Sequence, residues 1–483
     1  MSAFDAIVVG AGPNGLAAAV TLARAGLAVQ VLERSATPGG GARTAELTLP
    51  GFRHDVCSAV HPMALASRFF REFQLERRVE LRHPPVSFGH PLDAGRAGIA
   101  YRDLDRTIAG LGRDGTPYGA LMRPLVEDAD AVASFTGAQL LRMPDHPLVA
   151  ARFGLAALEQ GTPLWNLRFA DDAAPAMLAG VAAHAIRPMP SLAAAGAALS
   201  LAAYAHARGW PIPVGGSQSI VDALVADLLA HGGELVTDVE VTELDALPSA
   251  RAVLLDVTPR ALARIAARRL PARYLRALDR FAYGNGAAKV DFALSAPVPW
   301  RHPELHGAGT VHLGGTRAEI ARAELDVDRD RHAESPYVLA SQPSIVDGTR
   351  APDGQHVLWA YTHVPAGSTI DQTEVVTRQI ERFAPGFRDV VLATSSMTAI
   401  DMQRHNPNYV LGDIASGAAT LGQLVRRPVL STEPWRTPAR GIYLASASTP
   451  PGPGVHGLAG WYAALSALRH EFGLLTRPNL SVE

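Results

Sequence analysis

The most chemically informative residues stand near the start of the chain, where three glycines follow a short apolar run. Gly10, Gly12 and Gly15 have the G-x-G-x-x-G spacing directly after the β-branched run 6–9. Such a loop turns tightly, lets the backbone approach a pyrophosphate, and leaves the N–H groups at the start of the next helix free for phosphates. Glu33 ends a second apolar run, where a carboxylate accepts hydrogen bonds from a ribose. The pattern predicts a strand, a helix and a second strand that bind a dinucleotide.

A second glycine cluster follows the ribose acid. Gly40 and Gly41 lie between Arg34 and Arg43. A further close approach of backbone and arginine is useful when a longer cofactor continues past the pyrophosphate. The cluster therefore favours FAD over NAD.

Two later segments have the form of cofactor-binding elements. Residues 213–256 predict a glycine turn, a helix over 218–231 and strands over 234–241 and 251–256. Residues 441–449 predict a strand, followed by a loop of small residues and a helix over 461–469. A helix N-terminus at that place would stabilise the negative charge of a reduced flavin.

The glycine motifs at 10–43 and 441–460 resemble the phytoene-desaturase-like branch of the flavin amine oxidase superfamily. Its members include carotenoid desaturases and isomerases, retinol saturases, and pyridine nucleotide-disulfide oxidoreductase domain-containing proteins. The resemblance implies an α/β protein that holds FAD non-covalently. In it a Rossmann-like FAD-binding domain with a three-layer ββα/βα arrangement is interleaved with an α+β substrate domain of mixed sheet and helices. The implied FAD-binding domain comprises residues 1–62, 211–290 and 405–483, and the substrate domain 63–210 and 291–404.

The motifs and the resemblance together give a set of cofactor-binding residues, in which the backbone of one valine contacts the adenine. The set is Gly10, Gly12, Pro13, Asn14, Gly15, Glu33, Arg34, Gly40, Gly41, Arg43, Val239, Ser448, Gly454, Val455 and His456. Ser446 and Ala447 replace the Gly-Asp or Gly-Ala pair of many relatives, so an acidic contact at this position is absent.

Lys289 is the only lysine in the chain and stands near the start of the predicted strand 283–294. The segment is similar to the strand of flavin amine oxidases whose lysine holds a water against flavin N5. That resemblance implies that Lys289 orients hydride transfer or assists the reaction of reduced flavin with oxygen. A surface lysine at a strand start is the structural alternative.

The other candidates for acid–base catalysis are Asp55, His61 and His456, each of which also has a plausible structural use. Leu458 stands where the resemblance places an aromatic side chain of the amine oxidases, which argues for an apolar substrate. Trp359, Tyr361 and His363 alternate and should share one strand face.

Composition excludes several classes. In 483 residues, 44 basic side chains face 46 acidic ones, so a non-specific nucleic-acid binder is not expected. Cys57 is the only cysteine, which excludes a disulfide framework and a redox cysteine pair. No histidine spacing predicts a metal site. Without a signal-peptide pattern we expect a cytoplasmic protein. The alanine-rich stretch 191–207 predicts a buried helix or, alternatively, one that docks on a membrane surface.

These features predict an FAD-dependent oxidoreductase that dehydrogenates or saturates a carbon–carbon bond of a small apolar substrate and passes electrons to oxygen or a quinone. Two further enzymes fit the sequence: an amine oxidase that uses Lys289, and a redox-neutral double-bond isomerase. A flavoprotein that has lost catalysis and serves as an interaction partner is the non-enzymatic alternative.

Overall fold

The computed structural model describes residues 4–482. One half of the molecule is built on a parallel five-stranded sheet. The strand order is β16-β10-β1-β2-β9. The bounds are β1 (Ala6–Val9), β2 (Val29–Leu32), β9 (Glu234–Val236), β10 (Ala252–Leu255) and β16 (Ile442–Leu444). Strands far apart in sequence thus meet at one sheet edge, where the loops after β1, β2, β10 and β16 converge.

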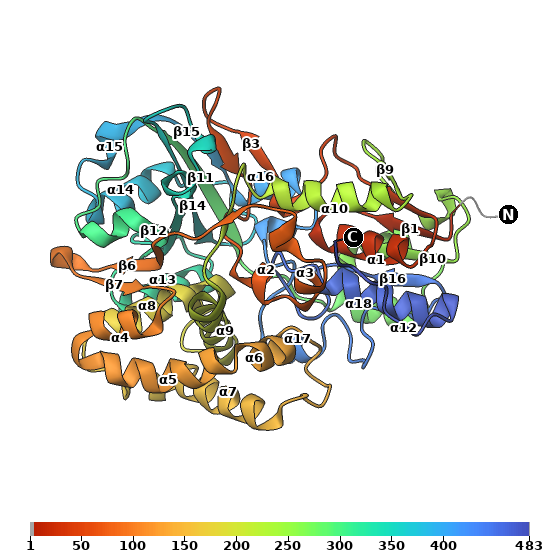
Figure 1. The fold of residues 1–483 in the computed structure, drawn as a ribbon, viewed down its shortest axis with the longest axis horizontal. Coiled ribbons are helices and arrows are strands. Elements are labelled where there is room, and N and C mark those ends of the chain that lie inside the picture. Colours follow the sequence, from red (N-terminus) through yellow and green to blue (C-terminus); the bar gives the residue numbers. More distant parts are fainter. Residues whose placement is uncertain (1–3, 483) are drawn as a thin grey trace.

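Helices cover both faces of this sheet (Figure 1). Ala6 and Val8 of β1 point to one face, and Ile7 and Val9 point to the other. The first face packs against α1 (Pro13–Arg24), α10 (Gln218–Ala230) and α18 (Leu458–Ala467). The second packs against α11 (Pro259–Ile265) and α12 (Ala272–Asp279). The three-layer Rossmann-like arrangement predicted from the sequence is confirmed.

The second sheet is mixed and has seven strands in the order β15-β11-β14-β13-β12-β6-β7. Its pairs are antiparallel except for β6 with β12. The bounds are β6 (Val86–Pro91), β7 (Ala97–Ala100), β11 (Gly286–Leu294), β12 (Ala308–Leu313), β13 (Val338–Ser341), β14 (His356–Val364) and β15 (Val391–Met397). One face packs against α14 (Thr373–Phe383), and the other faces a layer of helices.

That helical layer lies at the bottom of Figure 1. It consists of α4 (Leu104–Gly110), α5 (Gly115–Glu127), α6 (Ala129–Thr136), α7 (Pro147–Gln160), α8 (Ala173–Ala182) and α9 (Leu192–Arg208). Alanines let α9 pass closely between its neighbours, and Ala194, Ala198 and Ala202 are buried in the core. The alanine-rich stretch is therefore a buried helix and not a surface-docking one.

The remaining α-helices and strands lie between these elements along the chain. They are β3 (Thr44–Glu46), β4 (Arg53–Asp55), α2 (Pro62–Ala66), α3 (Arg68–Glu72), β5 (Leu81–Arg82), β8 (Ile212–Pro213), α13 (Arg317–Asp328), α15 (Phe387–Val390), α16 (Ala399–His405) and α17 (Leu421–Val425). Within residues 4–482, no helix is long and apolar enough to cross a bilayer.

Two strands differ from the predicted elements in their bounds. The strand predicted over 234–241 ends at Val236, because Asp238 takes a left-handed conformation with φ +60° that cannot continue a strand. The strand that carries Lys289 begins at Gly286 and belongs entirely to the seven-stranded sheet. The chain therefore leaves the half that contains the five-stranded sheet slightly before residue 290.

Candidate active site

A cavity of about 760 Å³ runs from the glycine loop to the helical layer. One end is formed by the loops at the carboxyl edge of the five-stranded sheet. The other is walled by α6, α7 and α9 and by the face of the seven-stranded sheet. A nucleotide at the first end and a substrate at the second would share one continuous space.

The glycines of the first loop are required by close backbone approach. A Cβ at Gly15 would lie 2.0 Å from the carbonyl oxygen of Gly10, and one at Gly460 would lie 1.7 Å from that of Asn14. The contact between Gly15 and Gly10 closes the turn between β1 and α1. The contact between Gly460 and Asn14 lets α18 pack on the start of α1. These contacts leave the first turn of α1 open to the cavity, with its positive end available to an anion.

Glu33 is held rigidly at the end of β2. Its Oε2 accepts a hydrogen bond from the Ala11 N–H (2.8 Å), and its Oε1 accepts one from the Ser35 N–H (2.9 Å). Oε1 also accepts from Nη2 of Arg43 (3.5 Å), so the free acceptor site for a ribose hydroxyl group is on Oε2.

The second glycine segment lies against Arg43 and Tyr409. A Cβ at Gly41 would lie 2.1 Å from the Tyr409 hydroxyl, so a side chain there would displace this ring. The Nε of Arg43 is buried without a hydrogen-bond partner in the described chain, as is Oδ1 of Asn14. An unpaired guanidinium N–H beside an open helix N-terminus fits an anionic dinucleotide, whose pyrophosphate would satisfy it.

Fourteen of the fifteen predicted cofactor-binding residues line this cavity. They are Gly10, Gly12, Pro13, Asn14, Glu33, Arg34, Gly40, Gly41, Arg43, Val239, Ser448, Gly454, Val455 and His456. Gly15, the exception, serves the close packing described above.

Asp256 is a cavity residue that the sequence analysis did not single out. It follows β10, and its Oδ2 accepts a hydrogen bond from the Gly15 N–H (3.0 Å). Burial raises its pKa to about 7, against the hydrogen bond from Gly15 and with help from the charge of Glu33. The available signal was its place at the carboxyl end of a parallel strand, where ligand contacts gather.

Lys289 lies in a buried ion pair with Asp291, two residues farther along β11. Both side chains are 1% exposed, and His54 Nδ1 lies 3.4 Å from Oδ1 of Asp291. Lys289 pairs across the sheet with Tyr361, which lines the cavity. The lysine is therefore behind the cavity wall and not at the surface of the protein.

The two predicted histidines both line the cavity but differ in their bonding. The ring of His456 donates from Nε2 to the Gly452 carbonyl (3.1 Å) and accepts at Nδ1 from the Leu458 N–H (3.0 Å), so it braces the loop before α18. His61 Nε2 donates to the Ser217 hydroxyl (2.8 Å), because that hydroxyl donates to the Ser58 carbonyl. The lone pair on His61 Nδ1 has no partner in the described chain. Burial lowers the pKa of each ring to about 4, so both are neutral.

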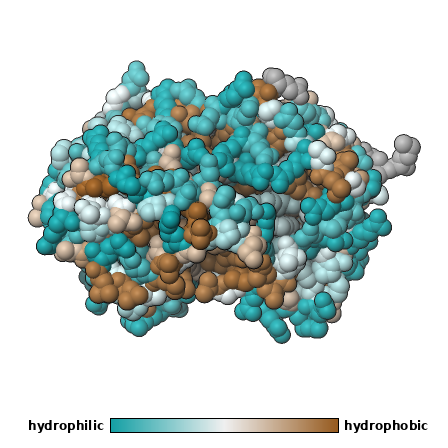
Figure 2. All heavy atoms as spheres, turned by 60° about the horizontal axis from the view of Figure 1, so that its bottom comes forward, coloured by the Kyte–Doolittle hydropathy of each residue, from teal (hydrophilic) through white to brown (hydrophobic). Residues whose placement is uncertain are grey.

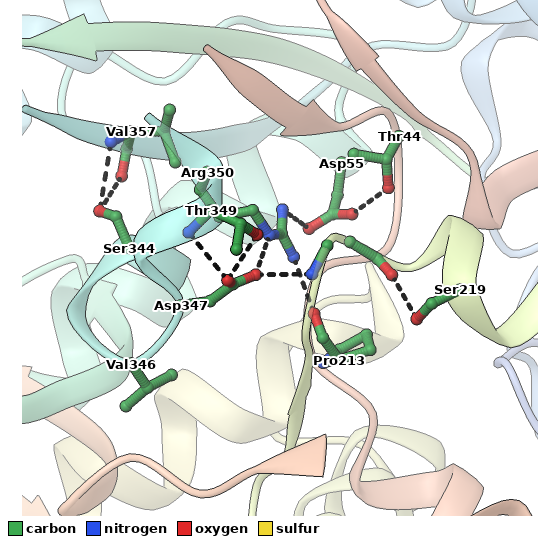
Figure 3. Close-up of polar contacts among 12 residues, drawn as sticks. Thr44, Asp55, Pro213, Ser219, Ser344, Val346, Asp347, Thr349, Arg350 and Val357 are labelled. Atoms are coloured by element: carbon green, nitrogen blue, oxygen red, sulfur yellow. Dashed lines mark hydrogen bonds and ion pairs between the residues drawn. The ribbon is translucent and has the colours of Figure 1, made fainter. Parts of the chain in front are cut away.

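Asp55 lies outside the cavity, in the buried network shown in Figure 3. Its Oδ1 accepts from the Thr44 hydroxyl (2.8 Å), and its Oδ2 accepts from Nη1 of Arg350 (2.9 Å). Arg350 also donates from Nε to Oδ2 of Asp347 (2.7 Å), which in turn accepts from the Gly215 N–H (2.8 Å). This network ties β4 to the glycine turn before α10, which gives Asp55 a structural place.

The substrate end of the cavity is mostly apolar. The side chains that form it come from the helical layer and from the sheet, and include Phe135, Phe153, Leu201, Leu339 and Trp359. Leu458, the first residue of α18, also lines the cavity. Among the described residues, the acidic side chains that line the cavity are Glu33, Glu240 and Asp256, all at its nucleotide end.

The chain is similar to a known family model, to known protein sequences and to solved structures. Residues 8–73 match the model of an NAD(P)-binding Rossmann-like domain. The chain is 26% identical to pyridine nucleotide-disulfide oxidoreductase domain-containing protein 2 of Rattus norvegicus, over 95% of this chain and 92% of the rat protein. It is also 26% identical to the phytoene dehydrogenase of Streptomyces griseus, over 80% of this chain and 77% of that enzyme. The structure superposes on wild-type putrescine oxidase bound to putrescine with a TM-score of 0.61 at 20% identity, covering 96% of this chain and 99% of the other.

The chain is thus similar over most of its length to a pyridine nucleotide-disulfide oxidoreductase domain-containing protein and to a phytoene dehydrogenase. The resemblance predicted from the glycine motifs is thereby confirmed. A flavin-type oxidoreductase follows from the relatives together with the cavity that contains those motifs. The likeness to putrescine oxidase, at 20% identity, concerns the fold alone.

Proposed function

We propose that this protein is an oxidoreductase that binds FAD non-covalently and dehydrogenates or saturates a carbon–carbon bond of an apolar substrate. The observation that carries the proposal is the cavity itself. It joins the complete dinucleotide motif to an apolar compartment in which no acidic side chain of the described chain is present. A cationic amine would be desolvated there without a counter-charge, whereas a hydrocarbon body gains free energy by burial.

The residues at the nucleotide end have distinct tasks. Glu33 would bind the ribose, the first turn of α1 and Arg43 the pyrophosphate, and the loop before α18 the flavin. When bound, FAD supplies the hydride acceptor or donor at flavin N5. His456 fixes the loop at residues 452–458 through its two backbone hydrogen bonds.

His61 is the best-placed candidate for the proton that accompanies hydride transfer. In dehydrogenation one carbon loses a hydride and its neighbour loses a proton, so a base must face the substrate. The Nδ1 lone pair of His61 is buried and unpaired in the described chain, so it would act as the base once a bound substrate brings the reacting carbon against it. The Ser217 hydroxyl holds the ring in the required tautomer. In the saturating direction the protonated ring returns the proton. Electrons would leave to oxygen or a quinone.

A second candidate, an amine oxidase, is supported by the aromatic wall beside Lys289. Trp359 and Tyr361 line the cavity with their rings 5.3 Å apart, on the strand that pairs with β11. Aromatic faces can surround an amine nitrogen. The aliphatic Leu458 and the absence of an acid at this end weigh against it.

The test is anaerobic bleaching of the bound flavin's visible absorbance by polyenes, fatty acids and amines. Bleaching by a polyene or a fatty acid, and not by amines, supports the proposal. Bleaching by amines alone assigns the second candidate and overturns the first. If the oxidised flavin responds to no compound, the same panel is added to the pre-reduced flavin, where reoxidation by an unsaturated compound supports the saturating direction.

We further propose that the helical layer contacts a membrane surface from which the substrate enters. In Figure 2 the bottom of Figure 1 is turned towards the reader. Apolar surface is gathered on that side of the molecule. The exposed apolar side chains of this layer and of the segments that join its helices include Met143, Leu148, Leu155, Leu158 and Leu167. Leu158 and Leu421 are exposed and also line the cavity, so this apolar surface continues into the cavity.

A further inference from the structure

A half-buried histidine, His184, and a buried one, His312, face each other at the wall of the substrate compartment. His184 follows α8, and His312 lies on β12. Their Nε2 atoms are 3.0 Å apart, so one ring must donate a hydrogen bond to the other. Gly180 makes room for this pair, because a Cβ there would lie 2.7 Å from Cβ of His312.

Only the first of these rings reaches the cavity. His184 is among the cavity-lining residues, whereas His312 is not. Nδ1 of His312 is fully buried and has no hydrogen-bond partner in the described chain. Nδ1 of His184 is likewise without a protein partner but is not closed off, so it faces the cavity.

The unpaired Nδ1 of His312 decides where the protons lie. A buried N–H without an acceptor is costlier than a buried lone pair without a donor. The proton of His312 is therefore on Nε2 and is donated to Nε2 of His184. The proton of His184 is then on Nδ1, which presents an N–H group to the cavity.

Both rings are neutral. Burial lowers the pKa of His184 to about 3, and burial together with the neighbouring histidines lowers that of His312 well below its ordinary value. A neutral donor in an apolar wall suits a neutral acceptor oxygen better than a carboxylate, whose desolvation it could not offset.

The other hydroxyl groups near the helical layer are satisfied within the protein. Thr136 and Tyr204 bond to each other (2.6 Å), and the Ser200 hydroxyl donates to the Gly196 carbonyl. The hydroxyl of Tyr361 has no such partner among the described residues, but it belongs to the strand that pairs with the strand of Lys289, at the flavin side. The N–H of His184 is thus a donor available to a substrate beside the helical layer.

We propose that the substrate carries a carbonyl or hydroxyl oxygen on its apolar body and that His184 Nδ1–H binds this oxygen, with His312 as the positioning residue. The inference rests on the proposed apolar compartment and adds a polar anchor to it. The anchor would fix which carbon–carbon bond lies over the flavin.

The test compares two probes of equal chain length, 2-tridecanone and n-tridecane, on the FAD-loaded protein. Displacement of the dye N-phenyl-1-naphthylamine reports binding of each, and we expect the ketone to bind about fivefold more tightly, the effect of one neutral hydrogen bond. Infrared difference spectra with ¹³C-labelled ketone report the carbonyl band, which should lie at lower wavenumber than in hexane.

Variants identify the donor. His184→Phe should return the carbonyl band to its hexane position and remove the preference for the ketone, while tridecane still binds. His184→Asn, whose amide N–H replaces Nδ1–H, should restore part of the shift. His312→Phe should reduce it. His206→Phe is the matched control, because His206 is also buried but bonds Tyr118 outside the cavity, and it should leave the shift unchanged.

The outcomes separate the two proposals. Equal binding of both probes with an unshifted carbonyl band, or a shift that persists in His184→Phe, overturns the role of His184 and leaves the apolar compartment standing. Failure of both probes to displace the dye overturns the apolar compartment and, with it, the inference drawn from it.

Discussion

Asp256 is the residue at which burial and the charge of a bound cofactor would both favour a protonated carboxyl group. Its carboxyl group lies under the glycine loop, bonded to the Gly15 N–H, at the place where a pyrophosphate is expected. With a pKa of about 7, the group is close to half ionised at neutral pH. A doubly charged pyrophosphate favours its protonated form.

The affinity for FAD should therefore fall as pH rises through 7. If only the protonated form accepts FAD, the loss between pH 6 and pH 8 is about tenfold. Asp256→Asn keeps an acceptor for the Gly15 N–H and should bind FAD equally at both pH values. Titration of the apoprotein with FAD, followed by flavin fluorescence, measures this, and an unchanged pH slope in the variant would rule out Asp256 as its source.

The same group affects stability without cofactor. Its folded-state pKa is raised from an ordinary 3.8, so the folded protein binds this proton more tightly than the unfolded chain. The contribution is full below about pH 4 and is lost as pH rises towards 7. Urea denaturation of the apoprotein should show Asp256→Asn gaining stability over the wild type at pH 7, and no difference at pH 4 would be expected.

Lys289 has a structural place in its ion pair with Asp291, and variants can test whether it also has the chemical task that the resemblance implies. Lys289→Met leaves the Asp291 carboxylate buried without its cation, which should lower the free energy of unfolding by about 3–5 kcal/mol. Lys289→Met with Asp291→Asn removes both charges and should recover most of that stability. Neither variant should lose FAD, and both should slow flavin reduction or reoxidation. Urea denaturation and stopped-flow reoxidation by oxygen give the two measurements; wild-type flavin rates in both variants would exclude the chemical task.

Sequence predicted the residues whose task is set by a local pattern. The glycines at 10, 12 and 15 and Glu33 act within one turn and two strands, so their spacing was sufficient. Asp256 and His184 have no such pattern. Their environment is created by segments far away in the chain, the glycine loop for one and β12 for the other. Their significance appears only when those segments are brought together.

At the scale of elements, the contact between α1 and α18 joins the two ends of the chain at the cofactor. Gly460 faces the Asn14 carbonyl at the start of α1, and backbone cannot yield as a flexible side chain does. Gly460→Ala should therefore separate the helices, destabilise the protein by about 3 kcal/mol and reduce FAD occupancy. Gly110→Ala, at the end of α4 with nothing within 4 Å of the added methyl group, is the control. Thermal unfolding and the flavin-to-protein absorbance ratio measure both effects; an effect no larger than that of the control would contradict the packing argument.

Periodicity predicted most elements of the cofactor half, because each strand or helix there is buried in a regular way. The helix predicted over 218–231 occupies Gln218–Ala230, and the strand over 251–256 occupies Ala252–Leu255. The seven-stranded sheet was not predictable as a whole. Its strand order places β6 beside β12, more than two hundred residues later, and no local signal records such a pairing.

At the scale of the whole molecule, the cavity exists because two sheets and one helical layer meet at a common space. Its nucleotide end is formed by loops of one sheet, and its apolar end by helices that cover the other. Neither half encloses the space alone. We therefore expect a hydrophobic substrate to enter through the helical layer, where α7 presents its leucines at the surface.

The exposed face of α7 is where a membrane would be in contact. Leu148 is 83% exposed and Leu155 is 69% exposed, and both lie on the helix whose Leu158 lines the cavity. Leu148→Glu with Leu155→Glu should weaken co-sedimentation with phosphatidylcholine vesicles about tenfold, because charged side chains cannot enter the acyl boundary. Flavin content should be unchanged. Leu475→Glu alters a leucine that is 81% exposed and outside the helical layer, and it should bind vesicles as the wild type does. Wild-type binding by the α7 variant, or equal loss in the control, would show that this face is not the membrane contact.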